Sequence, residues 1–257
     1  MKHKEYRKLH AEWYELASAK VDHRKEIDFL EKTLQAEKGP VLELGSGTGR
    51  VLIPLLERGF VVVGIDTSTD MMARCLAACQ VKGLKAELHE QSMTEFKLPR
   101  KFGVILLSSG SLSLFVFDGD IHALFERVMA HLEPGGLFLC EFEPVPVEGS
   151  SEKDGIWTGD WWDGADGSVI VRRRLRKYDA SIHVWEQLWV IDKFMDGRLV
   201  ETEADERTGR YYTVEEVVRF GESAGFAEIC ATDWLSGDPP RKGSDVVTVR
   251  CRRPKAG

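Results

Sequence analysis

Residues 41–50 read Val-Leu-Glu-Leu-Gly-Ser-Gly-Thr-Gly-Arg, and this stretch decides the fold. It is a short apolar strand that runs into a glycine loop and then into a helix-forming segment. The three alternate glycines allow the backbone to turn sharply and to approach a ligand that any Cβ would keep away. A dinucleotide fingerprint needs glycine at position 50, where Arg50 stands, and the Gly-Lys-Ser/Thr ending of a P-loop is missing. We therefore expect the loop to hold a nucleoside-like ligand without a pyrophosphate.

An acidic residue ends the next predicted strand. Residues 61–66 read Val-Val-Val-Gly-Ile-Asp and lie about twenty residues beyond the start of the loop. The carboxylate of Asp66 can accept hydrogen bonds from both hydroxyls of a ribose. A plain βαβ unit with a solvated Asp is the alternative, but the loop, the spacing and the terminal acid agree with a nucleoside site.

The run Glu43-Leu-Gly-Ser-Gly-Thr-Gly49 resembles motif I of the class I, Rossmann-like S-adenosylmethionine-dependent methyltransferases, of the small-molecule type. Asp66 and Pro134-Gly-Gly136 add to this resemblance, which covers residues 39–145 well and 211–251 loosely. The resemblance implies S-adenosyl-L-methionine as the cofactor. It also implies a set of cofactor-binding residues: Glu43, Gly45, Ser46, Gly47, Thr48, Gly49, Asp66, Thr67, Ser68, Met71, Ser92, Met93 and Ser108.

The chain departs from the family pattern after its third predicted strand. The family commonly carries an Asp there, which accepts a hydrogen bond from the adenine amino group, followed by an apolar residue that packs on the ring. Ser92 and Met93 stand at these positions. A hydroxyl can still accept the hydrogen bond, but without charge assistance. We expect a weaker hold on the adenine, or another group in this role.

Alternating strand and helix patterns predict an α/β fold with a doubly wound seven-stranded sheet, its last strand antiparallel, and helices on both faces. We predict three parts: an N-terminal helical lid (1–38), a methyltransferase domain (39–145 and 211–257), and an antiparallel β excursion (146–210) that shapes the acceptor pocket or an oligomer contact. The predicted sheet strands are 40–44, 61–66, 86–90, 102–108, 137–143, 226–232 and 245–251. Helices are predicted over 49–58, 69–81, 120–132 and 213–223, and excursion strands over 168–177, 182–194 and 198–211, with a hairpin at Asp196-Gly197.

Composition excludes several classes of protein. With 257 residues and a net charge of −7, the chain can bury a full core but lacks the basic excess that nucleic-acid binding favours. The five cysteines show no C-x-x-C spacing, so we expect a reduced, cytoplasmic protein without a metal. No apolar run reaches membrane-spanning length, so no membrane partner is expected. A monomer or a homodimer fits equally well.

The acceptor side of the site carries fewer sequence signals. Glu143, at the end of the fifth strand, is the preferred general base, with Glu141, His122 and His10 as alternatives to it. Tyr14, Ser109, Ser111, Trp157 and Trp161 are the candidate substrate contacts. The tryptophans lie in a Gly/Asp-rich stretch, read as a polar loop, where aromatic rings form a substrate wall or pack on nearby strands.

Two further patterns lie in the second half of the chain. Arg172–Lys177 is a basic run, which we interpret as a solvated edge strand. Arg210-Tyr-Tyr212 resembles an arginine-tyrosine element of small-molecule and sugar-amine methyltransferases.

The sequence therefore favours methyl transfer to a small-molecule acceptor by direct in-line displacement. The atom that is methylated, nitrogen, oxygen or carbon, stays open. A cofactor-binding regulator or assembly factor on the same fold is the main alternative. An aminopropyl transferase or a nicotinamide-dependent dehydrogenase is less favoured, because paired acids for a polyamine are not apparent and position 50 is Arg.

Overall fold

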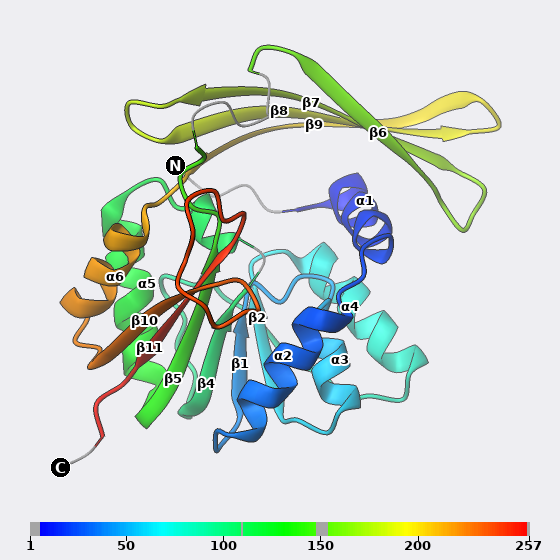
Figure 1. The fold of residues 1–257 in the computed structure, drawn as a ribbon. Helices are drawn as coiled ribbons and strands as arrows, with labels where there is room; N and C mark the ends of the chain where they lie inside the picture. Colours follow the sequence, from blue (N-terminus) through cyan, green and yellow to red (C-terminus); the bar gives the residue numbers. More distant parts are fainter. Residues whose placement is uncertain (1–5, 109, 148–153, 256–257) are drawn as a thin grey trace.

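A computed structural model describes residues 6–108, 110–147 and 154–255. Its main sheet consists of β1 (Val41–Leu44), β2 (Val62–Asp66), β3 (Glu87–Glu90), β4 (Phe102–Leu107), β5 (Leu132–Phe142), β10 (Glu228–Asp233) and β11 (Val247–Arg252). The strand order is β10-β11-β5-β4-β1-β2-β3 (Figure 1). β11 runs antiparallel to both of its neighbours, β10 and β5, and the other neighbouring strands pair in parallel. The predicted α/β class and seven-stranded sheet are confirmed.

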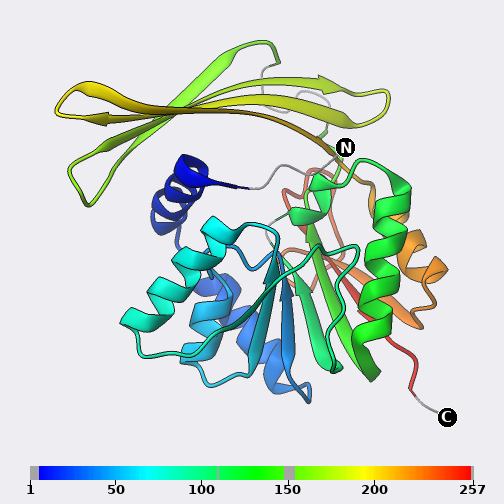
Figure 2. The same cartoon turned by 180° about the vertical axis from the view of Figure 1, so that it is seen from behind.

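Helices cover both faces of this sheet. They are α2 (Arg24–Gln35), α3 (Leu52–Glu57), α4 (Thr69–Val81), α5 (Asp118–His131) and α6 (Val214–Ser223), with a short 3₁₀ helix η1 (Ser111–Leu114) after β4. α2, α3 and α4 pack on one face, whereas α5 and α6 pack on the other (Figures 1 and 2). The sequence pattern did not predict the helix η1.

The central strands β1 and β4 are mostly apolar because both of their faces are buried. Val41 and Val104 face α2 and α3, whereas their neighbours Leu42 and Ile105 face α5. All four side chains are at most 2% exposed. Parallel strands covered by helices on both sides show this continuous apolar pattern.

A second, antiparallel sheet arches over the carboxyl ends of the main strands (Figures 1 and 2). It consists of β6 (Trp157–Asp163), β7 (Val169–Asp179), β8 (Val184–Met195) and β9 (Arg198–Arg210), paired in that order. The predicted turn between β8 and β9 is confirmed, with φ of +51° at Asp196 and +72° at Gly197. These positive angles are those that a tight hairpin turn requires.

Helix α1 (Lys8–Ala19) lies between the two sheets (Figure 1) and contacts β6, β8 and β9 of the second sheet and α4 of the main domain. Trp13 packs with its ring centroid 5.0 Å from that of Trp189 on β8. Glu12 pairs with Lys193 on β8 at 2.8 Å, while Glu15 pairs with Arg74 on α4 at 2.6 Å. The helix thereby ties the second sheet to the main domain.

Two predictions about the second sheet are wrong. Residues 155–164, expected to be a polar loop, contain β6, whose alternate side chains face opposite sides of the sheet. The basic run 172–177, expected to be an edge, lies in β7 between β6 and β8. Its alternate arginines contact aromatic rings: Arg172 lies 4.9 Å from the ring centroid of Trp13, and Arg176 lies 5.2 Å from that of Tyr178.

Within the described residues, no helix combines the length and the apolar character needed to cross a membrane.

Candidate functional site

The glycine loop after β1 is held close to the end of β2. The N–H groups of Gly45 and Ser46 donate to the carbonyl oxygen of Ile65, at 2.8 and 3.0 Å. Gly45 and Gly47 have φ of +69° and +54°, a region that glycine enters without strain. Both glycines line a cavity at the carboxyl end of the sheet, as does Ser46.

Gly49 has a different role from the other two loop glycines. A Cβ built on it would lie 2.6 Å from Sγ of Cys75 and 2.8 Å from the side chain of Ile53. Gly49 is buried and does not line the cavity. It is therefore required for the close approach of the loop to α4, not for ligand contact.

Asp66 is oriented by two backbone donors. Its Oδ2 accepts from the N–H of Gly47 and its Oδ1 from the N–H of Ser68, both at 2.8 Å. Ser68 in turn caps α4, because its hydroxyl accepts from the N–H of Met71 at 3.1 Å. Each carboxylate oxygen can accept more than one hydrogen bond, so Asp66 keeps acceptor capacity toward the cavity that it lines.

Glu43 is a buried acid in the cavity wall. It is 4% exposed, and burial raises the pKa of its carboxyl to about 8. Its Oε2 accepts no hydrogen bond. A buried acceptor left unsatisfied costs about 1–3 kcal/mol, so a donor that entered the cavity here would be stabilising.

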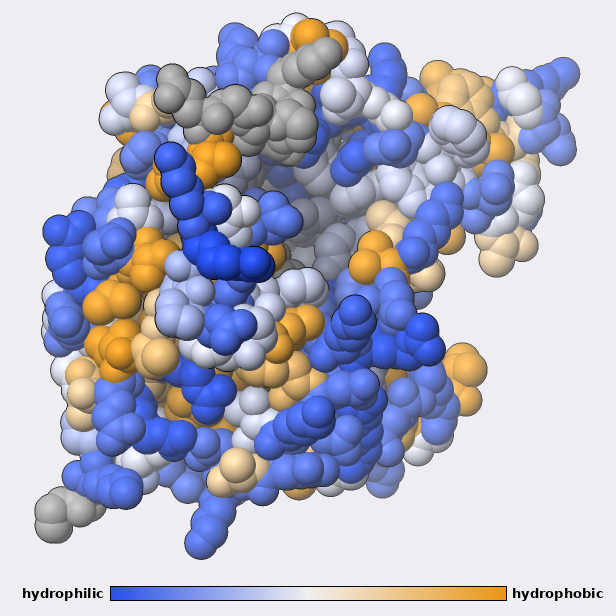
Figure 3. Space-filling view, viewed as in Figure 1, coloured by the Kyte–Doolittle hydropathy of each residue, from blue (hydrophilic) through white to orange (hydrophobic). Residues whose placement is uncertain are grey.

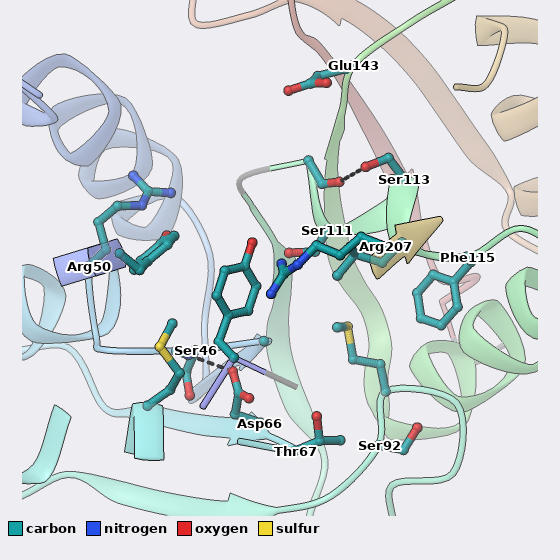
Figure 4. A pocket seen from close by; sticks show the side chains of 18 of the residues that line it. Ser46, Arg50, Asp66, Thr67, Ser92, Ser111, Ser113, Phe115, Glu143 and Arg207 are labelled. Carbon is teal, nitrogen blue, oxygen red and sulfur yellow. Dashed lines mark hydrogen bonds between the residues drawn. The ribbon is translucent and has the colours of Figure 1, made fainter. Parts of the chain in front are cut away.

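Arg50 stands beside this acid. Its guanidinium forms a two-pronged ion pair with Glu26 of α2, in which Nη2 lies 2.9 Å from Oε1. Arg50 lines the cavity on the side opposite Ser111 (Figure 4), and Tyr14 of α1 lines it as well. Burial raises the pKa of the Tyr14 hydroxyl, so this group is a neutral hydrogen-bonding partner at neutral pH.

The cavity has a volume of about 350 Å³ and lies between the glycine loop, α1 and the concave face of the second sheet. It opens as a hollow on the molecular face shown in Figure 3. Twelve of the sequence-predicted site residues line it: Tyr14, Glu43, Gly45, Ser46, Gly47, Asp66, Thr67, Met71, Ser92, Met93, Ser111 and Glu143.

The remaining predicted site residues lie elsewhere. Thr48, Gly49, Ser68 and Ser108 are not part of the cavity lining, and Ser109 lies outside the described residues. Ser68 acts as a helix cap, and the carbonyl oxygen of Ser108 accepts from the hydroxyl of Ser111 at 3.1 Å.

Neither predicted tryptophan contact lines the cavity. Trp157 and Trp161 lie on the outer face of β6 and are 48% and 67% exposed. Trp162, the next residue along the strand, points inward and packs against Trp13, with 5.8 Å between ring centroids.

The four candidate general bases differ in their surroundings. Glu143 is exposed and lines the cavity just after β5. Glu141 is buried and accepts from Nε1 of Trp234 at 3.2 Å, and His122 packs against Phe220 with 5.1 Å between ring centroids. Burial lowers the pKa of His10 to about 3, and neither this histidine, Glu141 nor His122 lines the cavity.

Sequence reasoning missed the contribution of the second sheet to the site. Its cavity-lining residues are Arg174 on β7, Trp185, Gln187 and Trp189 on β8, and Arg207 on β9. They recur at every second position, so they all face the same side of the sheet. The sequence shows this period-two pattern, but it does not show which of the two sets of alternating side chains faces the cavity. Tyr211 of the arginine-tyrosine element also lines the cavity, whereas the buried Tyr212 donates to the carbonyl oxygen of Phe115 at 2.7 Å.

Comparison with known proteins finds a family match for the first part of the main domain. A family described as "Methyltransferase domain" matches residues 41–136, which include the glycine loop, Asp66 and Pro134-Gly-Gly136. Residues 41–136 of this chain match a methyltransferase domain. The resemblance inferred from Glu43–Gly49 is confirmed for this region.

Relatives and solved structures agree with the methyltransferase domain. A Geobacillus sp. (strain WCH70) protein, named only as a candidate methyltransferase, is 25% identical over 154 residues, which cover 58% of this chain and 62% of that protein. The Streptomyces fradiae dTDP-3-amino-3,6-dideoxy-alpha-D-glucopyranose N,N-dimethyltransferase is 29% identical over 136 residues, which cover 51% and 52% of the two chains. This chain thus spans less than two thirds of the length of either relative. The crystal structure of an S-adenosylmethionine-dependent methyltransferase from Clostridium acetobutylicum shares the fold, with a TM-score of 0.77, 20% identity, and coverage of 93% of this chain and 95% of that one.

Proposed function

We propose that this protein is an S-adenosylmethionine-dependent methyltransferase that acts on a small-molecule amine. The observation that carries the proposal is that Asp66 and Glu43 both line one cavity, beside the glycine loop. The name of the aminosugar-modifying relative supports nitrogen as the methylated atom. This choice goes beyond the sequence, which left nitrogen, oxygen and carbon open.

The residues of the main domain fit the cofactor. Asp66, oriented by the N–H groups of Gly47 and Ser68, would accept hydrogen bonds from the ribose hydroxyls. The unsatisfied Oε2 of Glu43 would accept from the amino group of the methionine portion, whose positive charge would favour the ionised carboxylate. Met71 and Met93 supply apolar wall in the same cavity, and Ser92 supplies a hydroxyl.

In such a methyl transfer, the protein contributes mainly by positioning the acceptor nitrogen, because the methyl group of the cofactor is already reactive. The cofactor would supply an electrophilic methyl group, to which the amine nitrogen forms a bond as the carbon–sulfur bond breaks, with the electron pair left on sulfur and S-adenosylhomocysteine released. The second sheet would hold the acceptor in line and exclude water, the two contributions that matter most for such a displacement.

Glu143 is the proposed general base. It lines the cavity at the end of β5, where it would take the proton that the acceptor nitrogen loses. Glu143→Gln keeps the shape of the side chain but removes the base, so turnover should fall by roughly 100-fold while affinity for S-adenosylhomocysteine stays the same. Glu141→Gln, on a carboxylate outside the cavity, is the matched control. Equal turnover in the wild type and Glu143→Gln would remove Glu143 from the mechanism.

The cofactor assignment is tested by calorimetric titration with S-adenosylmethionine and S-adenosylhomocysteine. Asp66→Ala should weaken both by about 10- to 100-fold, because the hydroxyls lose a charged acceptor. Glu90→Ala is the matched control, since Glu90 lies opposite Asp66 on β3 but outside the cavity lining. If neither S-adenosylmethionine nor S-adenosylhomocysteine binds to the folded wild-type protein, the proposal is wrong.

Turnover separates the enzyme from the regulator or assembly factor that shares its fold. The assay follows transfer of an isotopically labelled methyl group to a panel of amino sugars and other small amines. Cofactor binding without transfer to any acceptor in the panel or in a cell extract would favour the regulator. A cytoplasmic location and a monomeric or homodimeric state stay predictions from the sequence.

A further inference from the structure

The acceptor side of the cavity carries two arginines. Arg174 on β7 and Arg207 on β9 both line it, with Gln187 of β8 between their strands. Gln187 is the register partner of Arg207. Among the described lining residues on this side, Glu143 is the acid, so the two guanidinium groups outnumber it.

The guanidinium of Arg207 is held by several contacts, but one of its nitrogens, Nη2, has no hydrogen-bond partner. Its residue is 7% exposed, and its Nε donates to Oδ2 of Asp205 at 2.9 Å. The guanidinium carbon lies 3.8 Å from the ring centroid of Tyr6 and 4.9 Å from that of Trp189. Its Nη2 is buried and donates no hydrogen bond. Two aromatic rings and one carboxylate therefore fix the plane of the cation.

The side chain of Arg207 reaches from β9 into the cavity. Figure 4 shows it projecting from its strand toward the middle of the cavity, which Ser111 and Asp66 also line. A planar guanidinium matches the geometry of a carboxylate or a phosphate, and a low-dielectric aromatic setting strengthens such a pair. A neutral ligand would leave the Nη2 group without an acceptor of comparable strength.

We propose that the acceptor carries an oxyanion group, a carboxylate or a phosphate, that is bound by Arg207 together with Arg174. The binding of this group on the second sheet positions the methylated nitrogen toward the glycine loop. This inference rests on the proposed function for the identity of the acceptor, but the oxyanion site itself is defined by the arginines of the second sheet. Arg207 is thus a specificity-determining residue.

The test uses the full chain saturated with S-adenosylhomocysteine, at constant ionic strength because charged contacts are screened by salt. Phosphate, pyrophosphate and acetate are the probes, titrated by calorimetry and by thermal shift. Since Arg207→Met alone would leave Asp205 buried without its cation, the test variant is the double change Asp205→Asn with Arg207→Met, which removes both charges. Arg198→Met, at an exposed arginine on the same strand, is the matched control.

We expect saturable, millimolar binding of at least one probe to the wild type and to Arg198→Met, and an affinity at least tenfold weaker in the double variant. Preference for acetate would identify a carboxylate-bearing acceptor, and preference for phosphate or pyrophosphate a phosphorylated one. Absence of saturable binding to the wild type, or equal affinity in the double variant, overturns the inference. So does a loss confined to S-adenosylhomocysteine affinity, which would place Arg207 on the cofactor instead.

The two proposals fail separately. If S-adenosylhomocysteine does not bind, the methyltransferase proposal fails, and the same titration on the free protein still decides whether the oxyanion site exists. If S-adenosylhomocysteine binds but the anions do not, only the acceptor inference is lost.

Discussion

Replacing Gly49 by Ala tests whether the last glycine of the loop serves packing instead of ligand contact. The added Cβ would lie 2.6 Å from Sγ of Cys75 and 2.8 Å from the side chain of Ile53, both well inside van der Waals contact. Gly49 also has φ of +86°, where a side chain is strained. Gly59 provides a matched control, because its φ is +83° and a Cβ there meets no atom within 4 Å.

The magnitude follows from the difference between the two sites. Backbone strain of about 1–2 kcal/mol applies to both substitutions. The loss of unfolded-state entropy, which favours Ala by about 0.4–1 kcal/mol, also applies to both. Overpacking against Cys75 and Ile53 adds about 1–3 kcal/mol to Gly49→Ala alone. The free energy of unfolding should therefore fall by that much more for Gly49→Ala than for Gly59→Ala.

Urea denaturation followed by circular dichroism measures this difference, and calorimetry on the folded variants measures affinity for S-adenosylhomocysteine. We expect the stability of Gly49→Ala to fall while the affinity of its folded form stays unchanged. Equal destabilisation at Gly49 and Gly59 would refute the packing argument. A stable Gly49→Ala protein with reduced affinity would show that this glycine contacts the ligand after all.

Three further predictions concern single residues. In the folded protein the pKa of Glu43 is about 8, whereas the carboxyl of the unfolded chain titrates near 4.5. The free energy of unfolding of the wild type should therefore fall as pH rises through this interval, by up to about 1.4 kcal/mol per pH unit. Glu43→Gln should remove that dependence, which urea midpoints from pH 5 to 9 would measure, and the same pH dependence in both proteins would contradict the raised pKa. Thr213→Ala removes the cap of α6, whose hydroxyl accepts from the N–H of Glu216 at 3.2 Å, and should lower the unfolding free energy by about 1 kcal/mol; no change in the urea midpoint would mean that the cap is replaced by solvent. Trp161→Ser changes an outward-facing side chain, so KM for any acceptor found should not move, and a raised KM would place this residue in the acceptor site.

Local signals in the sequence determined the main domain. The glycine loop, the acid at the end of β2 and the capping box of α6 each depend on residues close together in the chain, and their backbone geometry follows from local rules. The apolar runs of β1 and β4 similarly predicted that both faces of these strands are buried. These local features were sufficient to place Glu43 and Asp66 at one site.

Only the tertiary structure decided which face of the second sheet meets the cavity. Alternation along β7, β8 and β9 divides their residues into two sets but does not say which set turns inward, because both sets contain tryptophan or charged residues. The choice depends on α1, whose Trp13 packs against Trp189 on the inner face of the second sheet, the face that also carries Arg207. Long-range packing of this kind has no local signature, and for that reason the sequence determined the glycine-loop side of the cavity, while the tertiary structure alone assembled the side formed by the second sheet.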